Sequence, residues 1–510
     1  MNGLGDWIRY NADWAGQRLA LALGEESYTY AEMDRAVDRL AHLLHEGLGI
    51  GPGDRVAFLG LNNPQLVLLL FACARTGSSI LPLNNRLAVP EHRWILEHSG
   101  AGFLFVEDEF VARAGAISAA LPDLQMVAMG AAPDTGWLSQ SELLAAADDA
   151  PFVDVGGLDD RVLLIYTSGT TGKPKGVVHK QRALFYNALN AIHAQEMRAT
   201  DHVLSVLPLF HSGGLNIQTT PAFYVGASVS LLRRFDAGET LQAIQTLKPT
   251  MFLAVPAVIT AMVHHPEWEH ADLSSLRMVG TGSSAVPDAL LNAWHERGIP
   301  ATQIYGLTES APTAICLPLA ETRRKLGAAG KPAIHCAARV ADGEGRTVPP
   351  GERGEILLQG PNLFSEYFDD PETTDESHND GWFHTGDIGH MDDEGFYYVD
   401  DRKKDVVISG GENIYPAEIE NLLADMPELE EYAVVGQPDE RWGEVPVACV
   451  VLAEGCELGA QALLARFEGQ LARYKHPRVV RYFEELPRNA MGKVLKFQLR
   501  DMLGNGVANT

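Results

Sequence analysis

The sequence has little positive charge for its length. Its 510 residues carry 40 Lys and Arg against 67 Asp and Glu, which gives a formal net charge of −27. A negative field of this size repels polyanions, so we expect no nucleic-acid partner. Any phosphate-bearing ligand must be held by local cations, backbone dipoles or a metal ion.

The sequence also lacks closely spaced cysteines. Its five cysteines are scattered along the chain, at Cys73, Cys316, Cys336, Cys449 and Cys456. Zinc sites and redox motifs need cysteine pairs a few residues apart, so neither is indicated. We expect reduced thiols in the core.

No segment has the length of a membrane span or the pattern of a secretory signal. The strongest apolar run, residues 66–74, is far shorter than the roughly 20 residues that a spanning helix needs, and it predicts a buried helix instead. Residues 1–16 contain charged side chains in place of an apolar stretch. We therefore expect no membrane span and a cytoplasmic location.

The order of apolar segments predicts an α/β protein. Strand-like runs at 55–59 and 102–106 alternate with helix-length segments at 30–45 and 65–76, a pattern typical of layered folds with largely parallel sheets. From about residue 343, closely spaced strand-like runs and Gly/Pro turns predict a β-rich subdomain that closes the large N-terminal region. A helix from Pro416, strands at 432–435 and 445–452, and a helix from about Gly459 predict a small α+β domain.

A loop rich in glycine, hydroxyl groups and lysine follows a predicted buried strand at 163–166. It reads Thr167-Ser168-Gly169-Thr170-Thr171-Gly172-Lys173-Pro174-Lys175-Gly176. Glycines let backbone N–H groups turn toward a phosphate, while hydroxyl and ammonium groups add donors and charge. The loop is not a Walker A motif, because only two residues separate Gly169 from Gly172 and proline follows the lysine.

This loop resembles the phosphate loop of the adenylate-forming superfamily, which includes acyl-CoA synthetases, peptide-synthetase adenylation domains and beetle luciferases. Further stretches of the family pattern follow in the family's order over nearly the whole chain. The resemblance implies an N-terminal domain (1–401) with the acyl and ATP sites, and a mobile C-terminal domain (402–510) with the catalytic lysine. It also implies that ATP contacts the loop at Thr167, Ser168, Gly169, Thr170, Thr171, Gly172 and Lys175.

Two stretches resemble the rest of the nucleotide site. In residues 304–309, the resemblance implies that Tyr305 and Gly306 contact adenine, that Thr308 contacts the α-phosphate and that Glu309 ligates magnesium, a role that suits a single carboxylate beside phosphates. In residues 381–387, Asp387 would hold both ribose hydroxyls. The remaining contacts that the resemblance implies are Gly282, Ser283 and Ser284 beside adenine, where the two serines depart from the family's usual residues, and Arg402 at the ribose.

The C-terminal part carries the matching catalytic and hinge residues. Lys493, in residues 486–493, matches the adenylation lysine, whose charge would bridge the attacking carboxylate and the α-phosphate. Lys404 matches the position about which the small domain pivots. Contacts with coenzyme A are expected from Gly410, Gly411, Trp442 and Lys475, although each could equally be an ordinary surface residue.

The resemblance implies an ATP-dependent carboxylic acid:CoA ligase that uses Mg²⁺. It would form an acyl-adenylate and pyrophosphate, then an acyl-CoA and AMP. We expect His211, Val255 and Ile304 to line an apolar acyl pocket, with a medium- or long-chain fatty acid as substrate and an aromatic acid of benzoate, cinnamate or ferulate type as the alternative.

Three other functions are disfavoured. A peptide-synthetase domain would carry an acidic residue beside Phe210, and none is there. Nothing in the sequence calls for the oxygen chemistry of a luciferase. A non-catalytic nucleotide-binding protein would lose Glu309 or Lys493, and both are present. The oligomeric state stays open, with a homodimer as one option.

Overall fold

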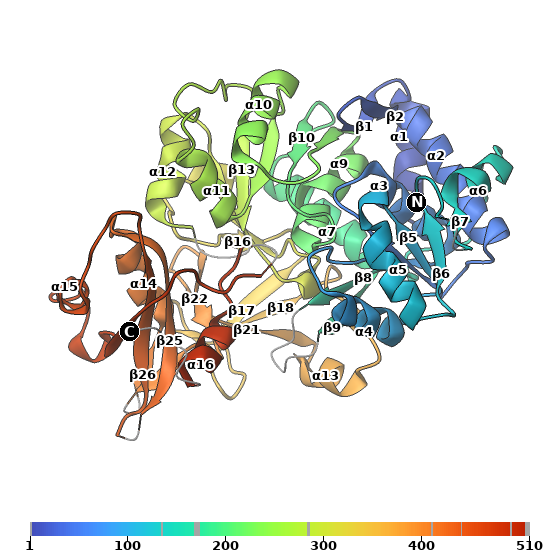
Figure 1. Ribbon diagram of the computed structural model, residues 1–510. Coiled ribbons are helices and arrows are strands. Elements are labelled where there is room, and N and C mark those ends of the chain that lie inside the picture. The colour runs from blue at the N-terminus through green and yellow to red at the C-terminus, as the bar shows by residue number, and fades with distance from the viewer. Residues whose placement is uncertain are drawn as a thin grey trace.

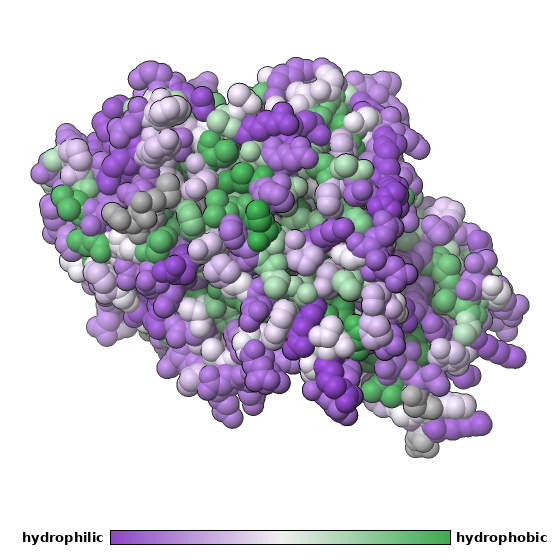
Figure 2. Space-filling model, turned by 180° about the vertical axis from the view of Figure 1, so that it is seen from behind, coloured by the Kyte–Doolittle hydropathy of each residue, from purple (hydrophilic) through white to green (hydrophobic). Residues whose placement is uncertain are grey.

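The computed structural model describes residues 3–133, 136–167, 174–282, 286–409, 412–439, 441–489 and 492–504. Figure 1 shows a large N-terminal region of helices around two sheets, with the C-terminal elements gathered at the other end of the molecule. Purple hydrophilic side chains cover most of the face in Figure 2, with green apolar side chains in separate groups. No described helix combines the length and apolar character that crossing a bilayer requires.

The first large sheet has nine strands in the order β16-β15-β14-β13-β12-β10-β11-β1-β2. The strands from β1 through β11, β10, β12 and β13 to β14 pair in parallel, whereas β2, β15 and β16 pair antiparallel at the edges. The bounds are β1 (Leu19–Leu23), β2 (Glu26–Thr29), β10 (His202–Ser205), β11 (Ser228–Leu231), β12 (Met251–Ala254), β13 (Met278–Gly282), β14 (Ala301–Tyr305), β15 (Ile315–Cys316) and β16 (Lys331–Pro332).

The second large sheet has eight strands in the order β19-β9-β8-β4-β3-β5-β6-β7. Its strands are β3 (Arg55–Leu59), β4 (Ser79–Pro82), β5 (Phe103–Val106), β6 (Gln125–Ala128), β7 (Leu138–Ser139), β8 (Arg161–Thr167), β9 (Lys175–Lys180) and β19 (Glu366–Tyr367). The antiparallel pairs are β8 with β9 and β9 with β19. The predicted strands at 55–59 and 102–106 are thus confirmed, and the expectation of largely parallel sheets holds.

Helices pack between and around these sheets. Their bounds are α1 (Gly5–Ala15), α2 (Tyr30–His42), α3 (Pro64–Thr76), α4 (Val89–Ser99), α5 (Val111–Ala120), α6 (Gln140–Ala146), α7 (Gln181–Ala194), α8 (Ser212–Gly214), α9 (Thr220–Val225), α10 (Ala237–Leu247), α11 (Pro256–Val263), α12 (Asp288–Glu296) and α13 (Pro371–Glu376). The predicted helix at 30–45 is shorter than expected, because α2 ends at His42 and the chain continues as a π-helical turn, Leu43–Gly47.

Helix α3 contains the apolar run 66–74, and it is buried as predicted. Its start is set by Asn63, whose side chain accepts a hydrogen bond from the backbone N–H of Gln65, and by Pro64 in the first turn. It ends at Gly77, which adopts the left-handed conformation with φ 74°. Capping and burial together explain why a segment with apolar residues on all sides forms a core helix.

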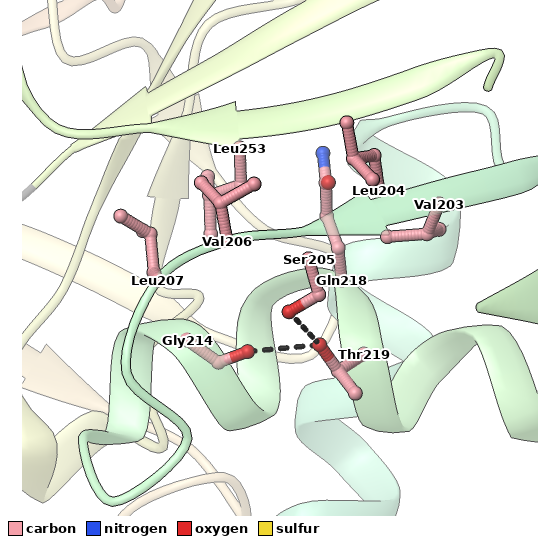
Figure 3. A pocket seen from close by; sticks show the side chains of 9 residues that line it. All are labelled: Val203, Leu204, Ser205, Val206, Leu207, Gly214, Gln218, Thr219 and Leu253. Carbon is pink, nitrogen blue, oxygen red and sulfur yellow. Dashed lines mark hydrogen bonds between the residues drawn. The ribbon is translucent and has the colours of Figure 1, made fainter. Parts of the chain in front are cut away.

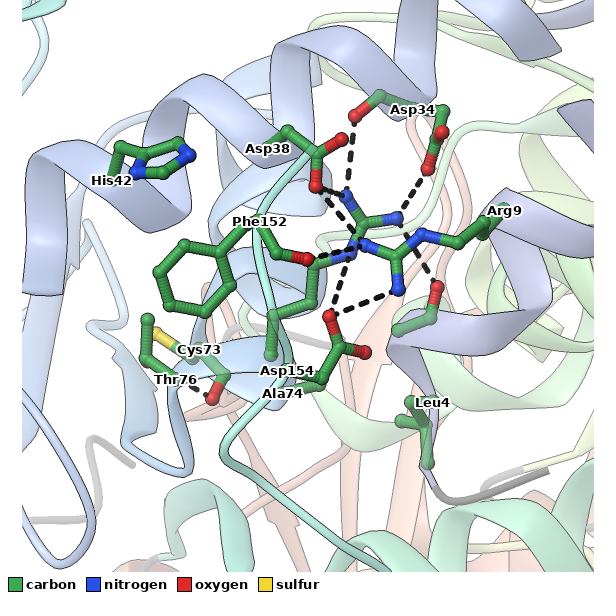
Figure 4. Close-up of polar contacts among 12 residues, drawn as sticks. Leu4, Arg9, Asp34, Asp38, His42, Cys73, Ala74, Thr76, Phe152 and Asp154 are labelled. Carbon is green, nitrogen blue, oxygen red and sulfur yellow. Dashed lines mark hydrogen bonds and ion pairs between the residues drawn. The ribbon is translucent and has the colours of Figure 1, made fainter. Parts of the chain in front are cut away.

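Buried charges tie this helix to its neighbours. The guanidinium of Arg75 at the end of α3 is fully buried and pairs with Asp34 and Asp38 of α2. Arg9 of α1 pairs with the same Asp38 at 3.1 Å and with Asp154 at 3.0 Å. Figure 4 shows the three carboxylates surrounding the two guanidinium groups. The network fixes the positions of three helices and the loop around residue 154.

Two smaller sheets follow. The β-rich subdomain contains β17 (Ala337–Ala341), β18 (Gly354–Gln359), β20 (His378–Asn379), β21 (Trp382–Met391) and β22 (Tyr397–Arg402). The small C-terminal domain contains β23 (Val407–Ser409), β24 (Glu412–Ile414), β25 (Leu429–Asp439), β26 (Gly443–Leu452), β27 (Val479–Tyr482), α14 (Pro416–Ala424), α15 (Ala460–Ala465) and α16 (Lys496–Gly504). Because β22 extends through Arg402, the boundary between residues 401 and 402 stays a prediction.

The cysteines are free thiols, as expected. Four of them are buried, but Cys456 is half-buried in a turn of the small domain and is an exception to the prediction of core positions. Burial raises the pKa of Cys73 to about 12, so this thiol stays protonated at neutral pH.

Candidate active site

The predicted nucleotide residues meet where β14, β21 and β22 come together. Asp387 of β21 is buried, and both of its carboxylate oxygens are engaged. The hydroxyl of Tyr305, at the end of β14, donates to Oδ2 at 2.7 Å, and Nε of Arg402, at the end of β22, contacts Oδ1 at 2.8 Å. Burial, followed by the charge of Asp387, raises the pKa of Tyr305 well above its usual range, so the phenol remains a donor.

The turn after Tyr305 requires glycine. A Cβ at Gly306 would lie 1.6 Å from the carbonyl oxygen of Pro312, which is far inside van der Waals contact. The absence of a side chain therefore lets the backbone bend sharply into the 3₁₀ turn that carries Thr308 and Glu309 (Thr308–Ser310). Close approach explains the glycine that the sequence pattern contains at this position.

Glu309 lies near the strands that flank the phosphate loop. The hydroxyl of Tyr367 in β19 donates to its Oε1 at 2.9 Å, and Nζ of Lys175 lies 5.2 Å from the ring centroid of Tyr367. Thr167, at the end of β8, is paired in register with Lys175, at the start of β9. The loop between them, with the predicted phosphate-binding residues Ser168, Gly169, Thr170, Thr171 and Gly172, lies outside the described residues, as do Ser283 and Ser284 beside adenine.

Glu309 is the one carboxylate predicted to bind a metal ion in this region. The part of the chain that the structure describes contains no cluster of three or more His, Cys, Asp or Glu residues that could hold a metal by themselves. Within that part, Glu309 uses only Oε1 in a hydrogen bond. A Mg²⁺ ion that shares its coordination among one carboxylate, phosphates and water fits this donor set, whereas a fully protein-ligated ion does not.

The small domain brings Lys493 to the same region. A Cβ built on Gly492 would lie 3.1 Å from Cβ of Ala257 in α11, so the lysine loop touches the large domain. Lys493 keeps an exposed surface, but the protein around its ammonium group lowers its pKa, by removal of water first and by the positive charge of Arg402 second. Asp387 acts in the opposite direction. Lys493 and the ribose-site residues are therefore electrostatic neighbours.

The predicted acyl residues are apolar or neutral. Val255 and Ile304 are buried, at the start of α11 and in β14. His211 precedes α8 and is half-buried, and desolvation lowers its pKa to about 4, so the ring is neutral at pH 7. Their shared lining of one pocket stays a prediction. The sequence did not single out Gln218, whose Nε2 and the Cδ1 of Ile304 each lie 3.3 Å from the point that a Cβ on Gly280 would occupy.

The predicted coenzyme A residues differ in their exposure and in whether they already form an ion pair. The Trp442 ring is partly exposed and lies between the guanidinium groups of Arg441 and Arg478, at 4.8 Å and 5.7 Å from its centroid. Lys475 instead forms an ion pair with Glu418 of α14. Gly410 and Gly411 lie outside the described residues. The coenzyme A contacts therefore stay predictions.

The predicted pivot contacts the last helix of the small domain. The backbone carbonyl of Lys404 accepts a hydrogen bond from Arg500 of α16 at 3.4 Å. Nearby, Arg353 of the β-rich subdomain reaches Glu418 of the small domain at 2.8 Å and lies 4.4 Å from the ring centroid of Tyr415. The hinge role of Lys404 stays a prediction, and the contact between the domains described here is the one that Arg353 makes.

Models of two protein families match the chain. The AMP-binding enzyme family matches residues 8–368, and the AMP-binding enzyme C-terminal domain matches residues 418–493. The first range lies within the large N-terminal region and the second within the small C-terminal domain.

Characterised relatives are similar over nearly their whole length. An indoleacetate–CoA ligase of Aromatoleum aromaticum is 48% identical over 98% of both chains. A feruloyl-CoA synthase of an Amycolatopsis species is 41% identical over 98% of this chain and 99% of its own. A long-chain-fatty-acid–CoA ligase of Mycobacterium tuberculosis is 38% identical over 93% of this chain and 92% of its own.

Solved structures have the same fold. The o-succinylbenzoate CoA synthetase of Bacillus subtilis in complex with its acyl-adenylate intermediate is 33% identical and superposes with a TM-score of 0.87 over 97% of this chain and 98% of its own. An anthranilate CoA ligase in complex with anthranoyl-AMP is 28% identical and gives 0.91 over 99% and 98%. With the family models, the relatives and the fold in agreement, the chain belongs to the AMP-binding enzyme family and is an adenylate-forming acid:CoA ligase.

Proposed function

We propose that this ligase activates an aromatic carboxylic acid at the site where Tyr305, Asp387, Arg402 and Lys493 converge. The observation that supports adenylate formation here is that Lys493 of the small domain lies within electrostatic reach of Arg402 and Asp387, the residues predicted to bind the ribose. This arrangement suits the first half-reaction, in which the acid's carboxylate attacks the α-phosphorus of ATP and pyrophosphate leaves.

The chain's own residues supply positioning and charge. Asp387 would accept hydrogen bonds from the ribose hydroxyls, in exchange for its present contact with Tyr305. Lys493 would neutralise the negative charge that accumulates between the attacking carboxylate and the α-phosphate, and a site with little water strengthens that effect. Removal of water lowers the pKa of Lys493, and the two anions would offset this effect because their negative charge stabilises the ammonium form. The thiol of coenzyme A then attacks the acyl carbon of the adenylate, the C–S bond forms, and AMP leaves with the electrons of the broken C–O bond.

Glu309 and Thr308 would serve the phosphates. A relative's structure, the o-succinylbenzoate CoA synthetase of Bacillus subtilis, was solved in complex with ATP and magnesium ion. Here Glu309 would hold Mg²⁺, with phosphate oxygens and water as its other ligands, and the ion would reduce the negative charge on the phosphates. Tyr367 orients the carboxylate through its 2.9 Å hydrogen bond.

Support for an aromatic acid comes from the relatives and from the acyl residues. Indoleacetate and feruloyl ligases are more similar to this chain than the long-chain fatty-acid ligase is. Buried Val255 and Ile304 and the neutral His211 suit an uncharged ring. Our sequence-based preference for a fatty acid is thus replaced by its aromatic alternative.

A panel of acids tests this proposal. AMP release that depends on coenzyme A is measured for indole-3-acetate, ferulate, benzoate, a fatty-acid length series and apolar amino acids. We expect the highest kcat/KM for an aromatic acid, and amino acids should fail because an unpaired ammonium is costly to bury. A fatty acid as the best substrate would refute the aromatic assignment and leave the ligase assignment intact.

A further inference from the structure

Next to the predicted acyl residues lies a buried carboxamide with an unused acceptor. Gln218, in the π-helical turn Leu215–Thr219, is 1% exposed. Its Oε1 is buried and has no hydrogen-bond partner among the described residues. A buried acceptor without a partner is unfavourable, so such an atom in a substrate-binding region indicates a ligand that supplies the donor.

The orientation of this amide follows from its neighbours. Nε2 of Gln195, which is also fully buried, donates to the backbone carbonyl of Ile217 at 3.0 Å. The Oε1 of Gln195 is therefore an acceptor, and Nε2 of Gln218 donates to it at 2.8 Å. Nε2 of Gln218 also faces the carbonyl of Phe252 at 3.4 Å. If the O and N of Gln218 were exchanged, its oxygen would face the Oε1 acceptor of Gln195. The amide therefore has the orientation described, and its Oε1 is the atom without a hydrogen-bond partner.

The amide lies beside the predicted acyl residues. A Cβ built on Gly280 of β13 would lie 3.1 Å from Cδ1 of Leu253, 3.3 Å from Nε2 of Gln218 and 3.3 Å from Cδ1 of Ile304. Ile304 is a predicted acyl residue, and Leu253 lies two positions before Val255, another predicted acyl residue. Because Gly280 has no side chain, the space above it is bounded by the ends of these three side chains. Side-chain ends can rotate to admit a ligand, whereas backbone atoms cannot.

No donor to Oε1 is present in the part of the chain that the structure describes. Figure 3 shows the Gln218 side chain extending from its helix toward the strands between Leu204 and Leu253. The gap that it lines with Gly214, Thr219 and residues of β10 has no space for a water molecule. A hydrogen-bonding ring that enters must displace the methyl ends of Leu253 and Ile304, and it gains a partner that water does not provide here.

We propose that Gln218 is a specificity-determining residue whose Oε1 accepts a hydrogen bond from an N–H or O–H donor on the ring of the aromatic acid. This inference rests on the proposed function. An apolar pocket by itself discriminates weakly between isosteres, whereas a pocket with a buried acceptor rejects a ring without the donor, because the acceptor then stays unpaired.

The test compares acids that differ only in the donor. One pair is indole-3-acetate and benzofuran-3-acetate, in which oxygen replaces N–H, and the other is 4-hydroxycinnamate and cinnamate. We expect wild type to favour the donor-bearing acid of one pair by about ten- to a hundredfold in kcat/KM. The pair that shows the preference identifies the donor as N–H or O–H. Equal kcat/KM values within both pairs would overturn the inference without the use of any variant.

Variants then assign the effect to this side chain. Gln218→Met keeps the length of the side chain and removes the acceptor, so the preference should fall to about onefold while the donor-free acid keeps its kcat/KM. Gln140→Met is the matched control, because Gln140 is also buried, donates through Nε2 to another glutamine (Gln65, 2.9 Å) and has an unpaired Oε1. Its preference should equal that of wild type. A preference that survives in Gln218→Met contradicts the inference.

The panel separates failure of this inference from failure of the proposed function. Activation of aromatic acids with no preference for the donor refutes the role of Gln218 alone. Activation of fatty acids and of no aromatic acid refutes both. Calorimetric titration of each acid into the ATP-free enzyme gives a second readout, in which the difference in affinity within a pair should disappear in Gln218→Met.

Discussion

In the proposed function, Lys493 acts through one charge at one step. Replacing it by alanine removes the cation between the carboxylate and the α-phosphate, so we expect adenylate formation to fall by at least about a hundredfold. Thioester formation from a presupplied acyl-adenylate should be nearly unchanged, because that step no longer contains the α-phosphate attack. Acid-dependent exchange of pyrophosphate into ATP measures the first step, and acyl-CoA release measures the second. Equal losses in both steps would contradict this division of roles.

His179, in β9, shows how a single buried ring sets a pH dependence. Desolvation lowers its pKa from 6.5 to about 4, and the side chain is fully buried. The folded state therefore binds fewer protons than the unfolded state between these values, and the stability present above pH 6.5 is lost as the pH falls toward 4.

At pH 5 this difference amounts to about 2 kcal/mol relative to pH 7. We expect His179→Leu to show a correspondingly smaller loss of unfolding free energy between pH 7 and pH 5, measured by urea denaturation. His264→Leu, at an exposed histidine, is the control and should follow wild type. Parallel curves for His179→Leu and wild type would refute the assignment.

At the scale of elements, helices α1, α2 and α3 depend on the buried charges around Arg75. Arg75→Met leaves Asp34 and Asp38 without their fully buried partner, and uncompensated buried charge costs about 3–5 kcal/mol. We expect a large decrease in the unfolding midpoint in urea. Arg93→Met removes an exposed pair with Glu97 within α4 and should cost at most about 0.5 kcal/mol. Similar midpoints for the two variants would show that the Arg75 network contributes little.

At the scale of the whole molecule, Arg353 connects the two domains in the arrangement that brings Lys493 near Arg402 and Asp387, the proposed nucleotide residues. It contacts Asp400 of its own subdomain at 3.1 Å as well as Glu418 and Tyr415 of the small domain. The groups are partly exposed, so the contact is worth about 1 kcal/mol, or roughly a fivefold change in a domain equilibrium.

We expect Arg353→Ala to slow adenylate formation up to about fivefold and to leave thioester formation from a presupplied adenylate unchanged or faster. Arg346→Ala is the matched control, since Arg346 pairs only with Asp342 and Glu344 of its own hairpin, among the described residues. Rapid-quench measurements of the two steps give the answer. An equal slowing of both steps, or the same effect in Arg346→Ala, would remove Arg353 from domain positioning.

Local sequence was sufficient for elements whose own pattern decides them. Residues 55–59 form a strand as predicted, and the apolar run 66–74 lies inside α3 because caps and apolar residues near in sequence define it. The family pattern also predicted site roles for Tyr305, Thr308, Glu309, Asp387 and Arg402, and these roles stay predictions. By contrast, the end of α2 at His42 and the strand β22 through Arg402 depend on packing and pairing with distant segments.

By itself, the sequence determined the chemistry that is available, since a lysine, a carboxylate or a glycine at a motif position is a property of the chain. Only the tertiary structure decided which of these groups meet. Tyr367 contacts Glu309 across 58 positions, Tyr305 contacts Asp387 across 82, and Arg353 reaches Glu418 across 65. The orientation of Gln218 depends on Gln195 and on the backbone of Ile217. Such contacts follow from how sheets and helices pack, so the residues adjacent in sequence do not predict them.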